Sequence, residues 1–266
     1  MKKIIKDFLP PIFLKAIKSV ILSKYGFFGD YTSWQEAKKD CTGYDDAKIF
    51  EKVKTAILRV KSGEAVYERD SVLFDKIQYS WSALACLMYV AARNGGVLSV
   101  LDFGGSLGSS YFQNRKFFDG LDVKWSVVEQ PHFVEFGKKE MEDSNLKFYY
   151  TIEECLKERS SNVVLLSSVL QYLEKPYLML EKITGFKIPF ILIDRTPFSK
   201  NNHESIKIQK VPPYIYEANY PCWFFAETVV IKKMMGSGYN LLEVFISEID
   251  NEINGAIFKG LFFQNS

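Results

Sequence analysis

Apolar and polar positions follow two different patterns along the chain. From residue 33 to 94 apolar side chains recur with helical spacing, and Ser33 before WQEAKKD marks a helix start. From Val97 onward, short runs of β-branched and aromatic residues alternate with polar stretches of helix length. The chain therefore predicts an N-terminal helical cap over residues 1–94, followed by an α/β domain over 95–266.

Within the second region, five runs predict strands, and helix-like stretches separate them. The runs are VLSVLDF (97–103), VKWSVVE (123–129), LKFYY (146–150), NVVLLSS (162–168) and FILIDR (190–195). This alternation predicts a parallel, doubly wound sheet with helices on both faces.

The end of the chain predicts a different connection. After residue 195 a Pro- and Tyr-rich loop is expected, then a helix near FFAETVVIKKMMGSG. The last two runs, YNLLEVFISEID and AIFKGLFFQ, are joined only by NEING, so they predict an antiparallel hairpin, because a parallel crossover needs about a dozen residues. Five parallel strands closed by such a hairpin are the Rossmann-like, seven-stranded pattern of class I S-adenosylmethionine (SAM) methyltransferases.

The N-terminal stretch has lysines before apolar residues, yet Pro10, Pro11 and further lysines interrupt it. It therefore predicts neither an export signal nor a membrane span. Residues 12–22 fit an amphipathic helix with a basic face. Two alternatives remain open for this helix: it docks on its own domain, or it makes peripheral contact with the anionic inner membrane.

Composition narrows the function classes. With 266 residues, 47% of them hydrophobic, the chain is long enough for a large core. A formal net charge of +2 gives no field that would recruit nucleic acid. The four cysteines form no CxxC pair and lie near no histidine at ligand spacing, so we expect reduced thiols, a cytoplasmic protein and no metal site.

The first predicted strand ends in DFGGSLG, and spacing decides between three kinds of glycine turn. A dinucleotide fingerprint fails, because neither register supplies G-x-G-x-x-G. A Walker loop fails too, because the first downstream lysine is Lys116, inside the expected helix. The acidic-x-Gly-x-Gly-x-Gly turn of SAM binding remains, with Asp102, Gly104 and Gly108 in place and Ser106 at the middle glycine.

A second acid supports this interpretation. Glu129 follows Asp102 by 27 residues, at the end of the next predicted strand, where a carboxylate accepts hydrogen bonds from ribose hydroxyls. The alternative is an ordinary strand turn with no ligand.

Several blocks of the chain also resemble a family of SAM-dependent methyltransferases from bacterial surface-polysaccharide (lipopolysaccharide O-antigen or capsule) gene clusters. The blocks are YTSWQEAKKDCTGYDDAKIFEKV, VLDFGGSLGSSYFQNR, WSVVEQPHFVEFGKK, LLSSVLQYLEKPY, IDRTPF and VPPYIYEANYPCWFF. The resemblance implies methyl transfer from SAM to a glycan, with S-adenosylhomocysteine (SAH) as product. It also implies that Gly104, Gly105, Ser106 and Gly108 line the methionine end of SAM, that Glu129 holds the ribose and that Gln130 faces the adenosine.

Methyl transfer to a hydroxyl requires alignment and a base. At the end of the fourth predicted strand, Ser167 and Ser168 are candidates for the cofactor, and Gln171 and Tyr172 for the acceptor. The alternative role of this segment is to cap a helix.

Two candidates for the general base lie at or beyond the carboxyl end of the fifth predicted strand. Asp194 lies at this end, and His203 lies in the polar loop KNNHES that follows. Arg195 is a candidate to grip an anionic acceptor group, and the alternative is a plain Asp-Arg ion pair that fixes the loop.

An aromatic and proline-rich segment covers residues 211–225. Aromatic faces bind sugar rings, so Tyr214 and Tyr216 are candidates to bind the acceptor. Glu217, which is flanked by tyrosines, is a further candidate. The alternative is a segment that only covers the core.

These observations predict a methyltransferase of a cell-surface glycan or of its nucleotide- or lipid-linked precursor. Two alternatives remain: a methyltransferase of a small metabolite or protein, and an inactive SAM-fold protein that stabilises a polysaccharide assembly. The sequence leaves the oligomeric state open.

Overall fold

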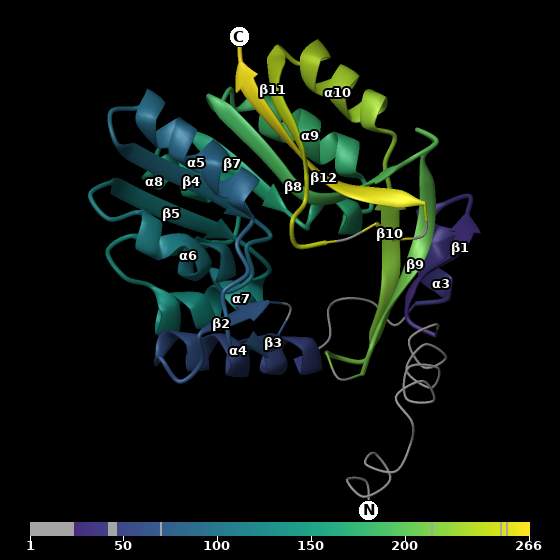
Figure 1. Cartoon of the computed structure of the whole chain (residues 1–266), viewed down its shortest axis with the longest axis horizontal. Helices are drawn as coiled ribbons and strands as arrows, with labels where there is room; N and C mark the ends of the chain where they lie inside the picture. The colour runs from purple at the N-terminus through teal and green to yellow at the C-terminus, as the bar shows by residue number, and fades with distance from the viewer. Residues whose placement is uncertain (1–23, 42–46, 70, 214, 251, 254) are drawn as a thin grey trace, which may run out of the picture.

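Seven strands form the main sheet of the computed structural model, which describes residues 24–41, 47–69, 71–213, 215–250, 252–253 and 255–266. The strand order is β11-β12-β8-β7-β4-β5-β6. The strands are β4 (Val97–Phe103), β5 (Asp122–Val128), β6 (Leu146–Tyr149), β7 (Val163–Ser167), β8 (Phe190–Ser199), β11 (Tyr239–Ile246) and β12 (Ala256–Asn265). The first five are parallel neighbours, and β12 pairs antiparallel with both β8 and β11. The predicted class I SAM-methyltransferase fold is confirmed by this order (Figure 1).

The sheet is buried on both faces, which explains why its strands are nearly continuous apolar runs. In β4, Val100 contributes to one hydrophobic cluster and Leu101 to the other, because successive side chains point to opposite faces. One cluster includes residues of α4 (Ala47–Lys61), α5 (Trp81–Arg93), α6 (Ser109–Asn114) and α7 (Pro131–Phe136). The other includes residues of α8 (Ile152–Glu158), α9 (Pro176–Gly185) and α10 (Glu227–Gly236).

The order of the strands along the chain reverses beside β4. The chain passes from β4 outward to β5 and β6, and then returns to β7 and β8 on the other side of β4. A crevice opens at the carboxyl ends of the strands at such a point. The turn after β4 therefore lies where a ligand is expected in this class of sheet.

A second, three-stranded antiparallel sheet was not predicted. It has the order β1-β9-β10 and consists of β1 (Gly26–Tyr31), β9 (Ser205–Val211) and β10 (Ala218–Phe224). The prediction of a loop after residue 195 is therefore wrong for most of that segment. The physical reason is visible in SIKIQKV, where Ile206 and Ile208 are buried and alternate with more exposed polar residues.

The N-terminal region joins this second sheet. Figure 1 shows β1 beside β9, although the two strands are far apart in the sequence. The helix α3 (Trp34–Lys39) has Ser33 as its N-cap, since the Ser33 hydroxyl accepts a hydrogen bond from the Glu36 amide. Trp34 stacks on Trp223 of β10, with 6.3 Å between the ring centroids.

The expected helices of the region 33–94 are present as α3, α4 and α5. Between α4 and α5, however, lies a short hairpin, β2 (Tyr67–Arg69) and β3 (Val72–Phe74). The amphipathic helix expected at residues 12–22 lies outside the described residues, and the domain boundary at 94 remains a prediction.

All four cysteines are free, as predicted, and three of them are buried. Within the described part of the chain, none of the helices has the length and apolar character needed to cross a membrane.

Candidate active site

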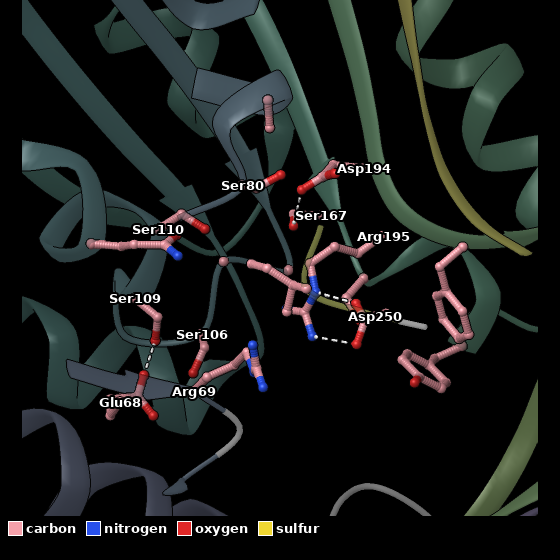
Figure 2. A pocket seen from close by; sticks show the side chains of 18 of the residues that line it. Glu68, Arg69, Ser80, Ser106, Ser109, Ser110, Ser167, Asp194, Arg195 and Asp250 are labelled. Atoms are coloured by element: carbon pink, nitrogen blue, oxygen red, sulfur yellow. Dashed lines mark hydrogen bonds and ion pairs between the residues drawn. The ribbon is translucent and has the colours of Figure 1, made fainter. Parts of the chain in front are cut away.

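A cavity of about 240 Å³ opens at the carboxyl edge of the main sheet (Figure 2). Its walls come from the ends of β4, β7 and β8 and from the start of α6. The other walls come from the β2–β3 hairpin, from β9 and β10, and from the loop between β11 and β12. The cavity therefore lies between the strand ends expected to bind a ligand and a group of elements of which the sequence predicted only the terminal hairpin.

The turn after β4 has an unusual backbone. Gly104 has φ +72° and Gly108 has φ +87°, in the left-handed region that favours glycine. Ser106, at the middle position, adopts φ 54° and is therefore strained. Gly104, Gly105 and Ser106 line the cavity, whereas Gly108 lies outside its lining and precedes α6 as the N-cap.

Glycine is required in this turn by close neighbours within the protein. A Cβ on Gly104 would lie 2.4 Å from Cγ2 of Val169, and a Cβ on Gly105 would lie 2.5 Å from Cγ of Asp102. The turn thus passes tightly between the end of β4 and the segment after β7. Any side chain at Gly105 would displace the Asp102 carboxylate.

Asp102 is buried at the end of β4 and lines the cavity. The Trp125 indole donates a hydrogen bond of 2.9 Å to its Oδ2. Burial raises the pKa of Asp102 to about 7, and the Trp125 hydrogen bond opposes part of that rise. The side chain can therefore exchange a proton near neutral pH.

Glu129 is the first residue after β5, the strand that lies next to β4 in the sheet. Its carboxylate accepts a hydrogen bond of 2.6 Å from the backbone amide of Gln130, and the backbone amide of Ser106 faces it and lowers its pKa. Burial raises the pKa of Glu129 to about 7. Glu129 and Gln130 do not line the cavity itself, but the Ser106 amide places the Glu129 carboxylate against the glycine turn.

At the end of β7, Ser167 and Ser168 both line the cavity. The Ser167 hydroxyl donates to Oδ2 of Asp194 at 3.2 Å. Ser168 adopts φ 55°, and its amide donates to the Asp194 carbonyl at 3.0 Å. Gln171 is fully buried and does not line the cavity; its amide donates to the Ser168 hydroxyl and to the Arg195 carbonyl, so it ties two turns together.

Asp194 ends the parallel part of β8 and is buried at the cavity wall. Burial raises its pKa to about 6, although the Arg195 charge and the Ser167 hydroxyl lower it. Its Oδ1 has no hydrogen-bond partner among the described residues. A buried carboxylate oxygen without a partner, at the wall of a cavity, is suited to accept a hydrogen bond from a ligand.

Arg195 forms its ion pair with Asp250, not with Asp194. Its Nε donates to Asp250 Oδ2 at 2.6 Å, and the two groups are shown joined in Figure 2. Arg195 adopts φ 51°. The alternative of an ion pair between Asp194 and Arg195 is therefore replaced by a link from β8 to the loop of the terminal hairpin.

Left-handed backbone recurs at three adjacent strands. Ser106 follows β4, Ser168 follows β7 and Arg195 lies within β8, and all three are non-glycine residues with φ between 51° and 55°. Each such conformation costs about 1–3 kcal/mol, and strain of this kind clusters at functional sites.

The aromatic segment contributes part of its predicted set. Tyr172 donates to Gln209 Oε1 at 2.7 Å, and its ring meets the Tyr220 ring edge-on. Tyr216 lines the cavity, and its hydroxyl lies 3.2 Å from the Tyr220 hydroxyl. Glu217 is exposed, because the alternation along this extended segment buries Tyr216 and Ala218 and turns Glu217 outward.

Besides Gly108, Glu129, Gln130 and Gln171, two more predicted residues do not line the cavity, and one is not described. Glu217 and His203 are both absent from its lining, since His203 lies on an exposed turn between β8 and β9. The placement of Tyr214 is outside the described residues.

Several residues of the cavity walls were not predicted, among them Glu68, Arg69, Ser109, Gln113 and Asp250. Glu68 is buried and accepts hydrogen bonds from the Ser109 hydroxyl and from the Ser71 amide. A hairpin with three-residue strands carries too little alternation to be recognised in a sequence. No local signal identifies these residues.

The residues of the carboxyl edge fit SAM. The glycine turn follows β4, and Glu129 is held against the turn by the Ser106 amide. Two buried acceptor atoms that line the cavity, Asn114 Oδ1 and Asp194 Oδ1, have no partner in the described structure. The turn would hold the methionine end, and Glu129 the ribose.

Three solved structures are similar to this chain at low sequence identity. A 1,6-didemethyltoxoflavin-N1-methyltransferase of Burkholderia thailandensis is 11% identical and has a TM-score of 0.47, with 91% of this chain and 94% of that chain covered. A magnesium protoporphyrin IX methyltransferase of Synechocystis PCC 6803 is 11% identical, with a TM-score of 0.46 over 70% of this chain and 83% of that chain. A glycopeptide N-methyltransferase is 10% identical, with a TM-score of 0.49 over 69% of this chain and 94% of that chain. No protein-family model and no curated protein matches the chain, so the fold assignment rests on the strand order and directions.

Proposed function

We propose that the protein is a SAM-dependent methyltransferase, with SAH as its product. One observation carries this proposal: the strained glycine turn after β4 opens into the cavity, and the acid that follows β5 faces the Ser106 amide of that turn. A turn that only connected a strand and a helix would not need a buried carboxylate against its backbone.

In this mechanism SAM supplies an electrophilic methyl group, and the chain supplies alignment and a base. Gly104, Gly105 and Ser106 position the donor at the strand ends. Asp194 accepts the proton of an acceptor hydroxyl through Oδ1, while Ser167 holds its other oxygen at 3.2 Å. A pKa of about 6 leaves Asp194 mostly ionised at neutral pH, so the base is ready for O-methylation.

We further propose that the acceptor is a bacterial surface glycan or its nucleotide- or lipid-linked precursor. The sequence resemblance to methyltransferases of surface-polysaccharide gene clusters supports this class. Tyr172, Tyr216 and Tyr220 also supply aromatic surface on the cavity wall opposite the turn. Aromatic rings bind sugar rings through apolar area, and their hydroxyls provide hydrogen bonds.

The test begins with calorimetric titration of the protein with SAH, followed by transfer from labelled SAM to glycan precursors and to small metabolites. Binding of SAH and labelling of a glycan are expected. Labelling of a non-glycan alone would support a small-molecule or protein methyltransferase instead. Absence of both SAH binding and thermal stabilisation would favour an inactive assembly protein.

A further inference from the structure

Two cations line the cavity within the described part of the chain, and they differ in their partners. Arg195 is neutralised by Asp250 through the 2.6 Å contact described above. Arg69 has no carboxylate within ion-pair distance among the described residues. Its Nη1 donates to Gln78 Oε1 at 2.8 Å, an uncharged acceptor. The positive charge of Arg69 is thus available to a ligand.

The Arg69 guanidinium is also held in a fixed orientation. It lies over the Phe74 ring, with 5.1 Å between its central carbon and the ring centroid. Gln78 anchors one of its two terminal nitrogens. A planar guanidinium restrained in this way loses little conformational freedom when it binds a carboxylate.

The hairpin that carries Arg69 is attached to the helix after the glycine turn. The Ser109 hydroxyl, in the first turn of α6, donates to the buried carboxylate of Glu68. Gln113, one helical turn later, donates to the Tyr67 hydroxyl at 3.1 Å. The two strand residues that precede Arg69, Tyr67 and Glu68, therefore have their side chains bound to α6. Figure 2 shows Arg69 and Ser106 facing the same open space.

We infer that Arg69 binds the methionine carboxylate of SAM, an inference that rests on the proposed function. The amino-acid end of SAM carries a carboxylate, and a buried carboxylate needs a charged partner. The glycine turn places this end beside α6, where Arg69 is, among the described residues, the cavity cation without a protein carboxylate. Glu68 acts as a positioning residue, because it fixes the hairpin through Ser109.

The experiment compares two ligands that differ in the carboxylate. SAH and decarboxylated SAH are titrated calorimetrically into the wild-type protein, into Arg69→Met and Arg69→Lys, and into Arg93→Met as a matched control on an exposed helix end. Wild type is expected to prefer SAH by about tenfold or more, since the carboxylate gains a charged hydrogen bond. Arg69→Met is expected to remove that preference, Arg69→Lys to restore part of it, and Arg93→Met to leave it unchanged.

Each opposing outcome overturns the inference in a recognisable way. Equal affinity of the wild type for both ligands would show that no residue recognises the carboxylate. Equal weakening of both ligands in Arg69→Met would indicate damage to the hairpin instead of a lost contact. Unchanged SAH binding with a raised acceptor KM would assign Arg69 to the acceptor. If wild type binds neither ligand, the proposed function fails as well, which separates that failure from the others.

Discussion

The two sides of the cavity are built in different ways. The side proposed to bind the methyl donor, called the donor side below, contains a consecutive strand, turn and helix, and its main features are backbone conformations after β4 and β7 and within β8. The opposite side is assembled from the β1-β9-β10 sheet and the loop of the terminal hairpin, while the β2–β3 hairpin, which carries Arg69, adjoins the donor side. The opposite side meets the cavity mainly with side chains.

This difference separates specificity for the methyl donor from specificity for the acceptor. Backbone geometry tolerates little change, since a single methyl group at Gly105 collides with Asp102. Side chains on separate elements can be exchanged without altering the path of the chain. One scaffold can therefore keep its donor and change its acceptor.

The largest effect is expected at the boundary between the two sides. Asp194→Asn removes the base, so kcat should fall by about 10² to 10⁴. SAH affinity should stay within about twofold, because the substitution leaves the glycine turn intact. Steady-state kinetics and calorimetry measure the two quantities, and a parallel loss of both would contradict the separation of the two sides.

The pH profile of the same pair of proteins adds a second readout. A base with a pKa of about 6 is active when ionised, so wild-type kcat should rise as pH increases through about 6 and then level off. Asp194→Asn should lose that rise. Asp122→Asn, at the exposed start of β5, is the matched control and should keep it.

The next effect is on the donor side alone. In Gly105→Ala the new Cβ would lie 2.5 Å from the Asp102 carboxyl carbon, so Asp102 or the turn must move. SAH affinity is expected to fall by about tenfold or more, the scale of one lost charged hydrogen bond. Gly185→Ala at the end of α9 meets open space and should bind SAH normally. Normal binding by Gly105→Ala would show that the turn does not hold the donor.

A stability effect tests the burial of the donor side. Burial raises the pKa of Asp102 from 3.8 to about 7, so the folded protein binds this proton more tightly than the unfolded chain. The resulting stabilisation is complete below about pH 4 and is lost as pH rises toward 7. The Asp102 proton makes the free energy of unfolding fall as pH rises, by at most about 1.4 kcal/mol per pH unit. Asp102→Asn should remove this part of the fall. Urea unfolding at several pH values measures the slope, and an unchanged slope would contradict a raised pKa.

The smallest effect is expected at Tyr172, which follows β7 and packs against the opposite side. Tyr172→Phe removes the 2.7 Å hydrogen bond to Gln209 but keeps the ring against Tyr220. The acceptor KM should rise by about fivefold, a loss of roughly 1 kcal/mol, while SAH affinity stays unchanged. Tyr89→Phe, which keeps its ring contacts outside the cavity, is the control. A change in SAH affinity alone would place Tyr172 on the donor side.

The strands and the glycine turn of the donor side could be predicted because their information is local. The run VLDFGGSLG contains the strand, the acid and the turn within a few residues, and Glu129 follows at the end of the next strand. The order of the parallel strands and the antiparallel closure follow from connection lengths. Each of these features depends on neighbours in the chain.

The other side could not be predicted, because its contacts join distant segments. Nothing near Phe27 indicates that it pairs with Gln209, and nothing near Arg195 indicates that Asp250 neutralises it. His203 and Glu217 were chosen for their chemistry, yet a turn and the strand alternation place both outside the cavity lining. Residue type alone did not reveal their orientation.

The pairing of β1 with β9 has a consequence for the order in which the protein acquires its parts. The chain between Tyr31 and Ile206 must be synthesised before these partners can meet, and closing so long a loop is entropically costly and slow. During translation, β4 and β5 and the glycine turn between them can form while β9, β10 and the terminal hairpin are still missing. A nascent chain should therefore acquire the framework for its methyl donor before it can distinguish one acceptor from another.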